Sequence, residues 1–339
     1  ERASIESAST ETADGTGSSA PPSAEDVVAD LDLRTKVKLL GGNGFWALHS
    51  VPQAGIAGIV VADGPHGLRC QVDNADHLGL AAAQPATCFP TAAALGSSWD
   101  VDLLDEVGRA IGEEALALGV SVVLGPGVNL KRHPAGGRSF EYLSEDPVLA
   151  GELGTAMVEG IQSQGVGTSL KHFAVNNQEH DRLRVSADVD DQPLRELYLA
   201  AFERVVRDAQ PWTVMCSYNR INGVYASQDP WLLTEVLRDE WGFDGLVVSD
   251  WGAVDDPTAA LPAGLDLEMP STGGASAARI AAAVTAGTLD EAALDLAIAR
   301  LTCAYAMVFG FGGLPLLYMG DELGMLNDRS YLDDPAKRA

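Results

Sequence analysis

Short apolar runs rich in β-branched residues recur along the chain and alternate with longer segments whose apolar residues follow a helical period. The strand-like runs are 58–62, 120–124, 166–170, 212–216 and 246–249. The helical segments are 101–118, 149–164, 192–208, 231–241 and 289–308. This alternation predicts βαβ units with right-handed crossovers around a parallel sheet. With this many units, the expected fold is α/β, a (β/α)8 barrel of the TIM type.

Changes in composition divide the chain into three parts. Residues 1–24 are rich in Ser, Thr, Ala, Gly and Glu, which predicts a disordered tail. Residues 25–312 carry the alternating pattern and predict one barrel domain. The pair Gly312-Gly313 interrupts that pattern, and residues 313–339 are too few to form a domain.

Composition and charge narrow the class of protein. A hydrophobic content of 46% and a mean hydropathy of +0.05 are typical of a globular protein. No apolar run approaches the roughly 18 residues of a membrane span. The net charge of −26 argues against nucleic acid or an anionic membrane as a partner. The chain begins at Glu1 and shows no basic-then-apolar signal peptide, which favours the cytoplasm as its location.

Neither a metal site nor a nucleotide cofactor is expected. The four cysteines, Cys70, Cys88, Cys216 and Cys303, form no CxxC motif and no metal-like spacing. They are interpreted as free buried thiols, with a Cys70–Cys88 disulfide left open. No GxGxxG follows an early strand and no GxxxxGK[ST] occurs, which disfavours the nucleotide-binding folds.

Polar and charged residues follow each strand-like run. In chain order they are Asp63 and Arg69, Arg132 and Arg138, Lys171 and His172, Ser217 and Tyr218, and Asp250 and Trp251. In a parallel barrel these positions meet at the carboxyl ends of the strands. Taken singly, each has an ordinary explanation as a helix cap or ion-pair partner. Arg132, Glu141 and Glu145 are interpreted as a structural ion-pair cluster, and Trp99, Trp212, Trp231 and Trp241 as core residues.

As a set, these side chains favour a neutral polyol. Carboxylates accept hydrogen bonds from hydroxyl groups, Arg and Lys donate to them, and an indole or phenol stacks on the apolar face of a sugar ring. A phosphate site would need the cations without the carboxylates. A metal site would need more His and Asp at short spacing. The expected ligand is therefore a sugar.

The motifs resemble glycoside hydrolase family 3, in particular its β-glucosidase branch, in collinear order over roughly residues 25–310. They include Asp63-Gly-Pro-His-Gly-Leu-Arg69, Gly137-Arg138-Ser-Phe-Glu141, Lys171-His172-Phe-Ala-Val-Asn176, Met215-Cys-Ser-Tyr218 and Val248-Ser-Asp250-Trp251. The loop that follows Lys171-His172 is unlike that of the N-acetylglucosaminidase branch, which is therefore disfavoured.

The resemblance implies a retaining mechanism on β-glucosides with Asp250 as nucleophile. It places Asp63, Arg69, Arg138, Lys171 and His172 on the nonreducing sugar, Met215 and Tyr218 near the nucleophile, and Trp251 at the neighbouring subsite. Such a carboxylate attacks the anomeric carbon and forms a glycosyl-enzyme that water then hydrolyses. A hydrogen bond from Tyr218 and the nearby cations are expected to lower the pKa of Asp250 and keep it ionised.

The chain departs from this family in two places. In the resembled β-glucosidases, the acid/base carboxyl belongs to an α/β sandwich domain after the barrel, and no room for that domain is expected after residue 310. Glu179, Asp181 and Asp255 have no motif support as substitutes. The tail 313–339 is similar instead to a segment of amylosucrase-like members of the α-amylase superfamily, without their catalytic Asp and Glu.

Two functions therefore stay open. The first is a retaining β-glucosidase whose turnover is impaired by the absent acid domain. The second is a non-catalytic sugar-binding remnant of a barrel. A third, transglucosylation of sucrose inherited from the tail, has little support. A barrel without its partner domain also exposes an apolar face, which predicts self-association into a homo-oligomer.

Overall fold

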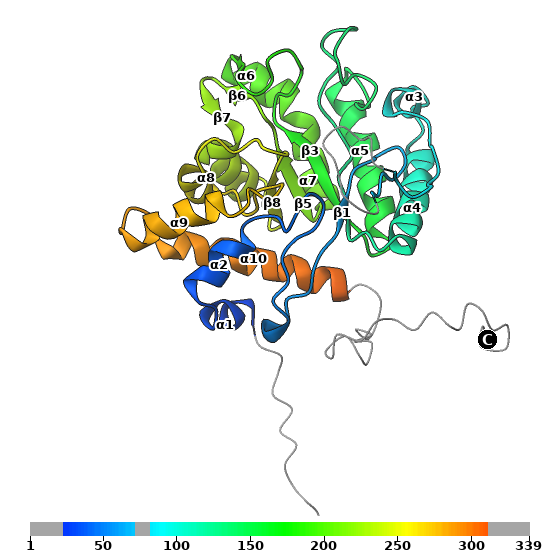
Figure 1. The fold of residues 1–339 in the computed structure, drawn as a ribbon. Coiled ribbons are helices and arrows are strands. Elements are labelled where there is room, and N and C mark those ends of the chain that lie inside the picture. The colour runs from blue at the N-terminus through cyan, green and yellow to red at the C-terminus, as the bar shows by residue number, and fades with distance from the viewer. Residues whose placement is uncertain (1–22, 72–81, 311–339) are drawn as a thin grey trace, which may run out of the picture.

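The computed structural model of the protein describes residues 23–71 and 82–310. Its main sheet has five strands in the order β1-β2-β3-β5-β8, each parallel to the next. The strands are β1 (Val61–Ala62), β2 (Val122–Val123), β3 (Gly167–Phe173), β5 (Thr213–Cys216) and β8 (Leu246–Ser249). Helices surround this sheet on the outside (Figure 1). The predicted α/β fold of the TIM-barrel type is confirmed.

Single bridges continue the sheet from β8 back to β1. They are Val248 with Leu267 and Glu268 with Gly41, both parallel, and Gly42 with Leu48 and Ala47 with Val60, both antiparallel. The two antiparallel pairings have a simple cause. A parallel crossover needs a dozen or more residues, usually a helix, whereas only residues 43–47 separate the first antiparallel pair. These pairings therefore close the sheet into a barrel, and the first element of the barrel along the chain is a hairpin and not a βα unit.

Several helices begin directly after a residue whose side chain caps them. Asp100 and Asp146 accept hydrogen bonds from the backbone amides of Leu103 and Leu149, and they cap the two long helices α4 and α5. Predicted and observed helix bounds agree to within about two residues. The helices are α1 (Ala24–Ala29), α2 (Leu33–Leu39), η1 (Pro52–Ala54), α3 (Ala92–Gly96), α4 (Val101–Ala117), α5 (Pro147–Gln162), α6 (Asp191–Pro193), η2 (Leu194–Tyr198), α7 (Ala200–Ala209), η3 (Ala226–Gln228), η4 (Trp231–Glu240), α8 (Pro257–Ala263), α9 (Ala275–Thr285) and α10 (Glu291–Gly310).

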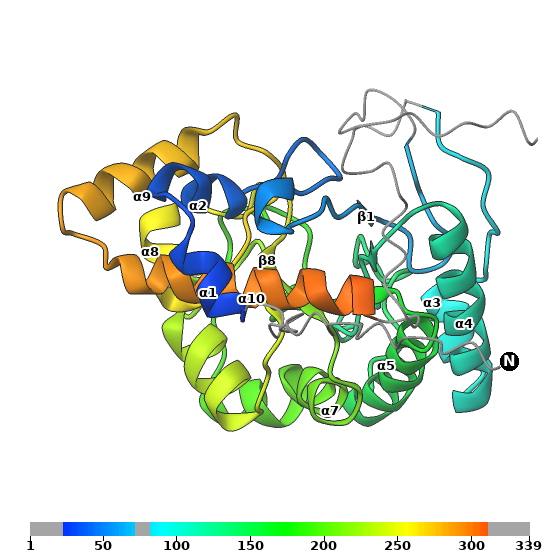
Figure 2. The same ribbon diagram turned by 90° about the horizontal axis from the view of Figure 1, so that it is seen from below.

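Helix α10 covers the amino-terminal ends of the barrel strands. Figure 2 shows it crossing the molecule in the view from below. Its buried residues Leu294, Ile298 and Leu301 belong to the same apolar cluster as Val61 and Leu246 inside the barrel. Since this end is filled with apolar side chains, the opposite, carboxyl-terminal end is the one available for chemistry.

A buried ion-pair network fixes α10 to the barrel. The carboxylate of Asp266 lies 2.6 Å from Arg238 of η4 and 3.1 Å from Arg300 of α10, and it also accepts a hydrogen bond from the backbone amide of Val247. Two cations thus compensate one carboxylate that is 2% exposed.

A smaller three-stranded sheet lies apart from the barrel sheet. It contains β4 (Ser186–Ala187), β6 (Arg220–Ile221) and β7 (Val224–Tyr225). Its strands follow β3 and β5 in the chain, so it belongs to the loops on the carboxyl-terminal side of the barrel. Sequence patterns gave no sign of these two-residue strands.

Several sequence interpretations concern particular side chains. All four cysteines are free, and Cys88 and Cys303 are exposed instead of buried. Trp212 and Trp241 are core residues as predicted, but the prediction for Trp99 is wrong, because its indole is 74% exposed beside the α4 cap.

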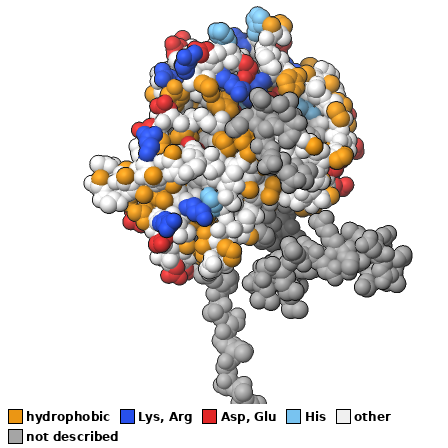
Figure 3. Space-filling view, viewed as in Figure 1, with side chains coloured by type: hydrophobic (Ala, Val, Ile, Leu, Met, Phe, Trp, Pro, Cys, Tyr) orange, Lys and Arg blue, Asp and Glu red, His pale blue; other side chains and the backbone are white. Residues whose placement is uncertain are grey.

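On the face seen in Figure 3, basic side chains are scattered among acidic and apolar ones. Across the described ranges, no helix is long and apolar enough to span a bilayer.

The predicted tails fall almost wholly outside the described residues. Of the tail 1–24, the structure describes residues 23 and 24, where Ser23 caps α1 through a capping box with Asp26. The segment 313–339 lies outside the described residues altogether.

Candidate active site

All nine of the side chains singled out in the sequence line one cavity of about 230 Å³, the catalytic cavity. They are Asp63, Arg69, Arg138, Lys171, His172, Met215, Tyr218, Asp250 and Trp251. Asp63 directly follows β1 and Asp250 directly follows β8. Lys171 and His172 were expected after a strand but lie within β3, because the pairing of β3 with β5 resumes at Phe173 and Cys216 after a register shift.

Asp250 is nearly buried, with 7% of its surface exposed. Its Oδ1 atom accepts a 2.7 Å hydrogen bond from the backbone amide of Trp251. Its Oδ2 atom has no hydrogen-bond partner among the described residues, and His172 Nε2 lies 3.6 Å away. One carboxylate oxygen is thus fixed by the backbone, while the other is buried at the cavity without a hydrogen bond from the described residues.

The expected direction of the Asp250 pKa shift is wrong. Burial raises this pKa above its usual value, although Arg138, the Trp251 amide, Lys171 and Tyr218 all oppose the rise. Tyr218 acts in the expected direction, because its interaction with the Asp250 carboxyl lowers this pKa, and its hydroxyl also donates to the backbone carbonyl of Trp251 at 3.1 Å. At this depth of burial, desolvation of the Asp250 carboxylate outweighs the effect of the neighbouring cations.

A chain of alternating charges lines the catalytic cavity, with the buried side chains of Lys171 and Glu141 at its centre. The Lys171 ammonium is 3.1 Å from Asp63 Oδ1 and 2.9 Å from Glu141 Oε1, and Arg138 Nε is 2.6 Å from Glu141 Oε2. Burial alone would raise the pKa of Glu141, but Lys171 and Arg138 outweigh it and hold this pKa well below its usual range. Glu141 is therefore an ionised support for two cations, not a proton donor.

His172 is held by its backbone and by its ring. Its backbone amide donates to Asn129 Oδ1 at 2.7 Å, and Asn129 Nδ2 donates to the His172 carbonyl at 3.0 Å. The ring nitrogen Nδ1 lies 3.1 Å from the Tyr142 hydroxyl. Burial, with Arg138 nearby, lowers the pKa of His172 well below its usual value, so the ring is neutral at pH 7.

Three aromatic or charged lining residues were missed in the sequence, and the apolar Leu124 also lines the cavity. Phe45 and Trp46 come from the opening hairpin and pack with Trp251, whose Nε1 donates to the Phe45 carbonyl at 2.9 Å. Arg182 stacks over the Tyr218 ring at 4.3 Å and pairs with Glu179 at 2.7 Å. None of the three belongs to a motif singled out in the sequence, so only the fold brings them to the cavity.

Glycine is required in the turn that carries Asp63. Gly64 has a φ of +109°, and a Cβ atom there would collide with the carbonyl oxygen of Gly67. The tight turn lets the Arg69 amide donate to the Asp63 carbonyl at 2.9 Å. Both side chains are thereby directed from one loop into the catalytic cavity.

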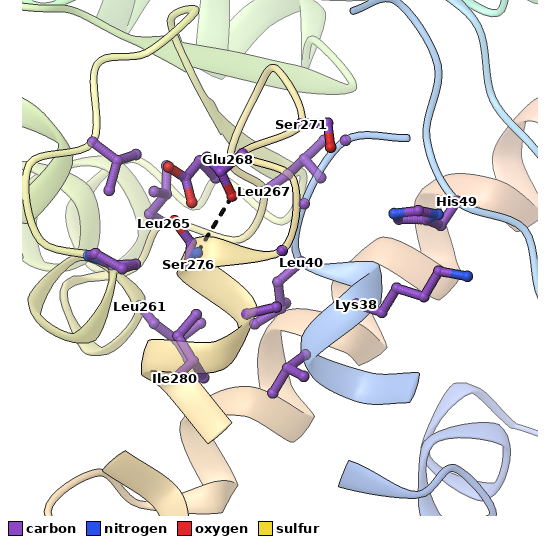
Figure 4. Close-up of a pocket in the computed structure, with 18 of the residues that line it drawn as sticks. Lys38, Leu40, His49, Leu261, Leu265, Leu267, Glu268, Ser271, Ser276 and Ile280 are labelled. Carbon is purple, nitrogen blue, oxygen red and sulfur yellow. Dashed lines mark hydrogen bonds between the residues drawn. The ribbon is translucent and has the colours of Figure 1, made fainter. Parts of the chain in front are cut away.

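A second and smaller cavity, of about 70 Å³, lies between α2, α8 and α9 and contains none of the predicted site residues. Figure 4 shows Glu268 interacting with Ser276 there, with Lys38 and His49 further away. Burial raises the pKa of Glu268, although Ser276 and Arg279 oppose the rise.

We expect Glu268→Gln to stabilise the protein slightly at pH 7. Because the folded pKa is raised, the carboxyl contributes stability below its usual pKa of about 4.5, and this contribution is lost as the pH rises through the folded value. The gain should stay below about 1 kcal/mol after solvent screening and vanish near pH 4. Thermal unfolding at both pH values measures it, with Glu106→Gln on the exposed face of α4 as control. A Glu268→Gln variant that is less stable than wild type at pH 7 would contradict the expectation.

Known proteins resemble the chain in sequence and in structure. It is 55% identical over 269 residues to an exo-α-(1→6)-L-arabinopyranosidase of Bifidobacterium breve, covering 79% of this chain and 35% of that protein. It is 51% identical over 275 residues to thermostable β-glucosidase B of Acetivibrio thermocellus, covering 81% and 36%. The structure of β-glucosidase 3B from Thermotoga neapolitana in complex with glucose is similar at 39% identity and a TM-score of 0.80, over 88% of this chain and 45% of that one.

The chain thus spans about a third of the length of the curated relatives it matches. Residues 60–304 match the profile of the glycosyl hydrolase family 3 N-terminal domain. This range includes every strand of the main sheet and all nine of the side chains gathered in the catalytic cavity. The chain therefore belongs to glycoside hydrolase family 3.

Proposed function

We propose that the catalytic cavity is the sugar site of a retaining β-glucosidase and that Asp250 is its nucleophile. The observation that carries the proposal is the free Oδ2 atom of a nearly buried carboxylate in a cavity lined by cations. A retaining glycosidase needs such a carboxylate within reach of the anomeric carbon. The names of the Acetivibrio and Thermotoga relatives, both β-glucosidases, support the substrate class.

The charged side chains suit the hydroxyl groups of a pyranose. Asp63 accepts hydrogen bonds from hydroxyls, while Lys171 and Arg138 donate to them from fixed positions beside Glu141. His172 is neutral and contributes a ring nitrogen next to Asp250. Arg69 is bridged to Asp63 through the backbone, and both Arg69 and Met215 of β5 line the cavity.

The aromatic residues suit the neighbouring subsite. Trp251 follows the nucleophile, and its ring centroid is 5.5 Å from that of Trp46. A sugar or aryl aglycone can stack on such rings through its apolar face. Tyr218 lines the same cavity as Asp250, and the Arg182 guanidinium stacks on the face of its ring.

Protonation of the leaving group requires a second carboxyl, about 5–5.5 Å from the nucleophile in a retaining enzyme. Within 23–71 and 82–310, Asp63 is the other carboxylate in the cavity lining, and it is paired with Lys171. Glu179 and Asp181 are paired with Arg182 and Arg184, and Asp255 is exposed outside the lining. We propose that these residues act without a proton donor of their own, so that turnover depends on a good leaving group.

We expect 2-deoxy-2-fluoro-β-glucosyl fluoride to label Asp250. Fluoride leaves without acid assistance, the carboxylate oxygen bonds to the anomeric carbon, and the 2-fluoro group slows hydrolysis of the ester. Peptide mass spectrometry should find one fluoroglucosyl group on the peptide that contains Asp250. The labelling rate should fall as the pH drops below the raised pKa of Asp250, since only the carboxylate is a nucleophile. No added mass, or mass on a different peptide, contradicts the assignment.

The sugar class needs a second probe, because the Bifidobacterium breve relative is named for arabinopyranose. Dinitrophenyl β-glucoside and dinitrophenyl α-L-arabinopyranoside share a leaving group and differ in the sugar. We expect a higher kcat/KM for the glucoside. A higher value for the arabinoside assigns the site to that sugar and leaves the role of Asp250 intact.

The alternative is a barrel that binds sugar without turning it over. It is favoured by the lack of a proton donor among the lining carboxyls described above. Glucose binding by calorimetry, together with no labelling of Asp250 and no release of dinitrophenolate, identifies this alternative.

A further inference from the structure

The role of His172 in hydrogen bonding depends on a residue outside the catalytic cavity. Lys171 and the arginines of the lining only donate hydrogen bonds, and ionised carboxylates only accept them. The ring of His172 is neutral, so one of its nitrogens donates and the other accepts. Nε2 is on the side of Asp250, 3.6 Å from Oδ2, and Nδ1 is on the side of Tyr142, which is not part of the lining. The partner of Nδ1 therefore decides what Nε2 presents to a sugar.

The backbone brings Tyr142 next to β3. Gly127 forms parallel bridges with both Tyr142 and Lys171. A Cβ atom on residue 127 would lie 2.9 Å from the Tyr142 ring, so only glycine lets the ring approach this closely. Tyr142 is 3% exposed, and its ring meets that of His172 edge-on with the centroids 6.1 Å apart. The hydroxyl is thereby placed 3.1 Å from Nδ1.

Asn176 determines the direction of the hydrogen bonds at the hydroxyl of Tyr142. Its Nδ2 atom donates to the hydroxyl oxygen at 3.2 Å and to Glu179 Oε1 at 3.4 Å. Because a carboxylate accepts hydrogen bonds, the contact with Glu179 keeps Nδ2, and not the amide oxygen, on this side. Burial raises the pKa of Tyr142, so the hydroxyl keeps its single proton. The hydroxyl thus accepts from Asn176 and has one proton to donate.

Two acceptors are within reach of that proton. They are His172 Nδ1 at 3.1 Å and the backbone carbonyl of Asn176 at 3.4 Å, and the shorter distance favours Nδ1. The other side of the ring gives the same answer. A proton on Nε2 faces the Oδ2 atom of Asp250, whereas the opposite tautomer would turn a lone pair toward this carboxylate oxygen.

We propose that Tyr142 is a positioning residue that keeps the proton of His172 on Nε2, so that the ring donates a hydrogen bond into the catalytic cavity. The acceptor is the oxygen of a sugar hydroxyl. This last step rests on the function proposed above, whereas the position of the proton is a property of the sugar-free protein. Tyr142 acts through His172 and does not line the catalytic cavity itself.

NMR of the whole chain with ¹⁵N-labelled histidine tests the position of the proton. The chain has six histidines, and nuclear Overhauser contacts with the Tyr142 ring assign the signals of His172 without a variant. In the sugar-free wild type at pH 7 we expect the proton on Nε2 and none on Nδ1. Tyr142→Phe removes the donor to Nδ1. The Nδ1 signal should therefore shift, either alone through loss of the hydrogen bond or toward the Nε2 signal through mixing of the two tautomers.

Tyr198→Phe is the matched control, because it removes a tyrosine hydroxyl outside the lining of the catalytic cavity and should leave both His172 signals unchanged. Circular dichroism verifies that each variant is folded, and the wild-type spectrum tests the proposal even if Tyr142→Phe does not fold. A proton on Nδ1 in the wild type, or an Nδ1 signal in folded Tyr142→Phe that equals that of the wild type, overturns the proposal.

Calorimetry with glucose tests the step that involves sugar. We expect Tyr142→Phe to raise the Kd for glucose at least about fivefold, which corresponds to about 1 kcal/mol, and Tyr198→Phe to leave it unchanged. An equal Kd in Tyr142→Phe and wild type overturns the role of Tyr142 in sugar binding. If glucose does not bind the wild type at all, the function proposed for the catalytic cavity fails, and the NMR spectrum still decides where the proton lies.

Discussion

Asp250→Gly is expected to lower the turnover of dinitrophenyl β-glucoside about 10⁴-fold, the scale on which removal of an essential catalytic group acts. The variant removes the free Oδ2 atom that is proposed to attack the anomeric carbon. It leaves the charged side chains of Lys171, Glu141 and Arg138 in place, so sugar binding should change far less than turnover. The measurement is dinitrophenolate absorbance, with kcat and KM determined separately.

Azide should restore activity to Asp250→Gly. The substitution leaves room for a small anion on the face that the carboxylate occupied. An azide nitrogen then bonds to the anomeric carbon while the bond to dinitrophenolate breaks, which gives the α-glucosyl azide. Formation of the α anomer, identified by NMR, is specific to attack from the position of Asp250.

Asp255→Gly is the matched control, because Asp255 is an exposed carboxylate five residues along the same loop region and outside the cavity lining. Its turnover should equal that of the wild type. Retention of a tenth or more of the wild-type activity by Asp250→Gly, or rescue that gives the β-glucosyl azide, would refute the assignment of Asp250.

Seven of the nine site residues that the sequence predicted lie within a strand of the main sheet or at most two residues after one, and the exceptions are Arg69 and Arg138. Asp250 directly follows the apolar run of β8, and Asp63 directly follows β1. A parallel barrel brings such positions to one end whatever its loops do. For this reason the strand pattern and the motifs were sufficient to gather nine residues that the structure places in one cavity.

The residues that were missed depend on contacts between distant segments. Trp46 reaches Trp251 only because the opening hairpin closes the ring of strands beside Glu268. Glu141 was interpreted as part of a cluster with Arg132 and Glu145, yet its partners are Arg138 and the distant Lys171. Spacing along the sequence does not show that Glu141, in a turn, has a partner 30 residues away on β3.

The pKa of Asp250 shows a second limit of sequence reasoning. The neighbouring cations were predicted correctly, and they do oppose the shift. The motifs do not show how deeply Asp250 is buried. The depth of burial sets the desolvation cost of the carboxylate, and here this cost decides that the pKa is raised. A bound sugar that donates a hydrogen bond to Oδ2 would act with the cations and favour the ionised carboxylate.

Glu141→Gln is expected to destabilise the fold by about 3–5 kcal/mol, the usual effect of removing one partner from a buried ion pair. The amide keeps one acceptor oxygen but turns an NH2 donor toward either Lys171 or Arg138, which are themselves donors. It also leaves the 2%-exposed ammonium of Lys171 with Asp63 as its remaining carboxylate partner among the described residues. Both cations are proposed to bind sugar hydroxyls, so KM for dinitrophenyl β-glucoside should also rise. Urea unfolding and steady-state kinetics measure the two effects.

The pH dependence distinguishes this electrostatic origin from loss of packing. The pKa of Glu141 is held well below its usual value of about 4.5, so its contribution is present above pH 4.5 and is lost as the pH falls toward the folded pKa. The difference in stability between wild type and Glu141→Gln should therefore shrink below pH 4.5. Glu152→Gln is the control, because its 3.0 Å pair with Arg204 is exposed and contributes about 1 kcal/mol or less. If Glu141→Gln costs no more than this control, the two cations do not need Glu141, and its place in the site is incidental.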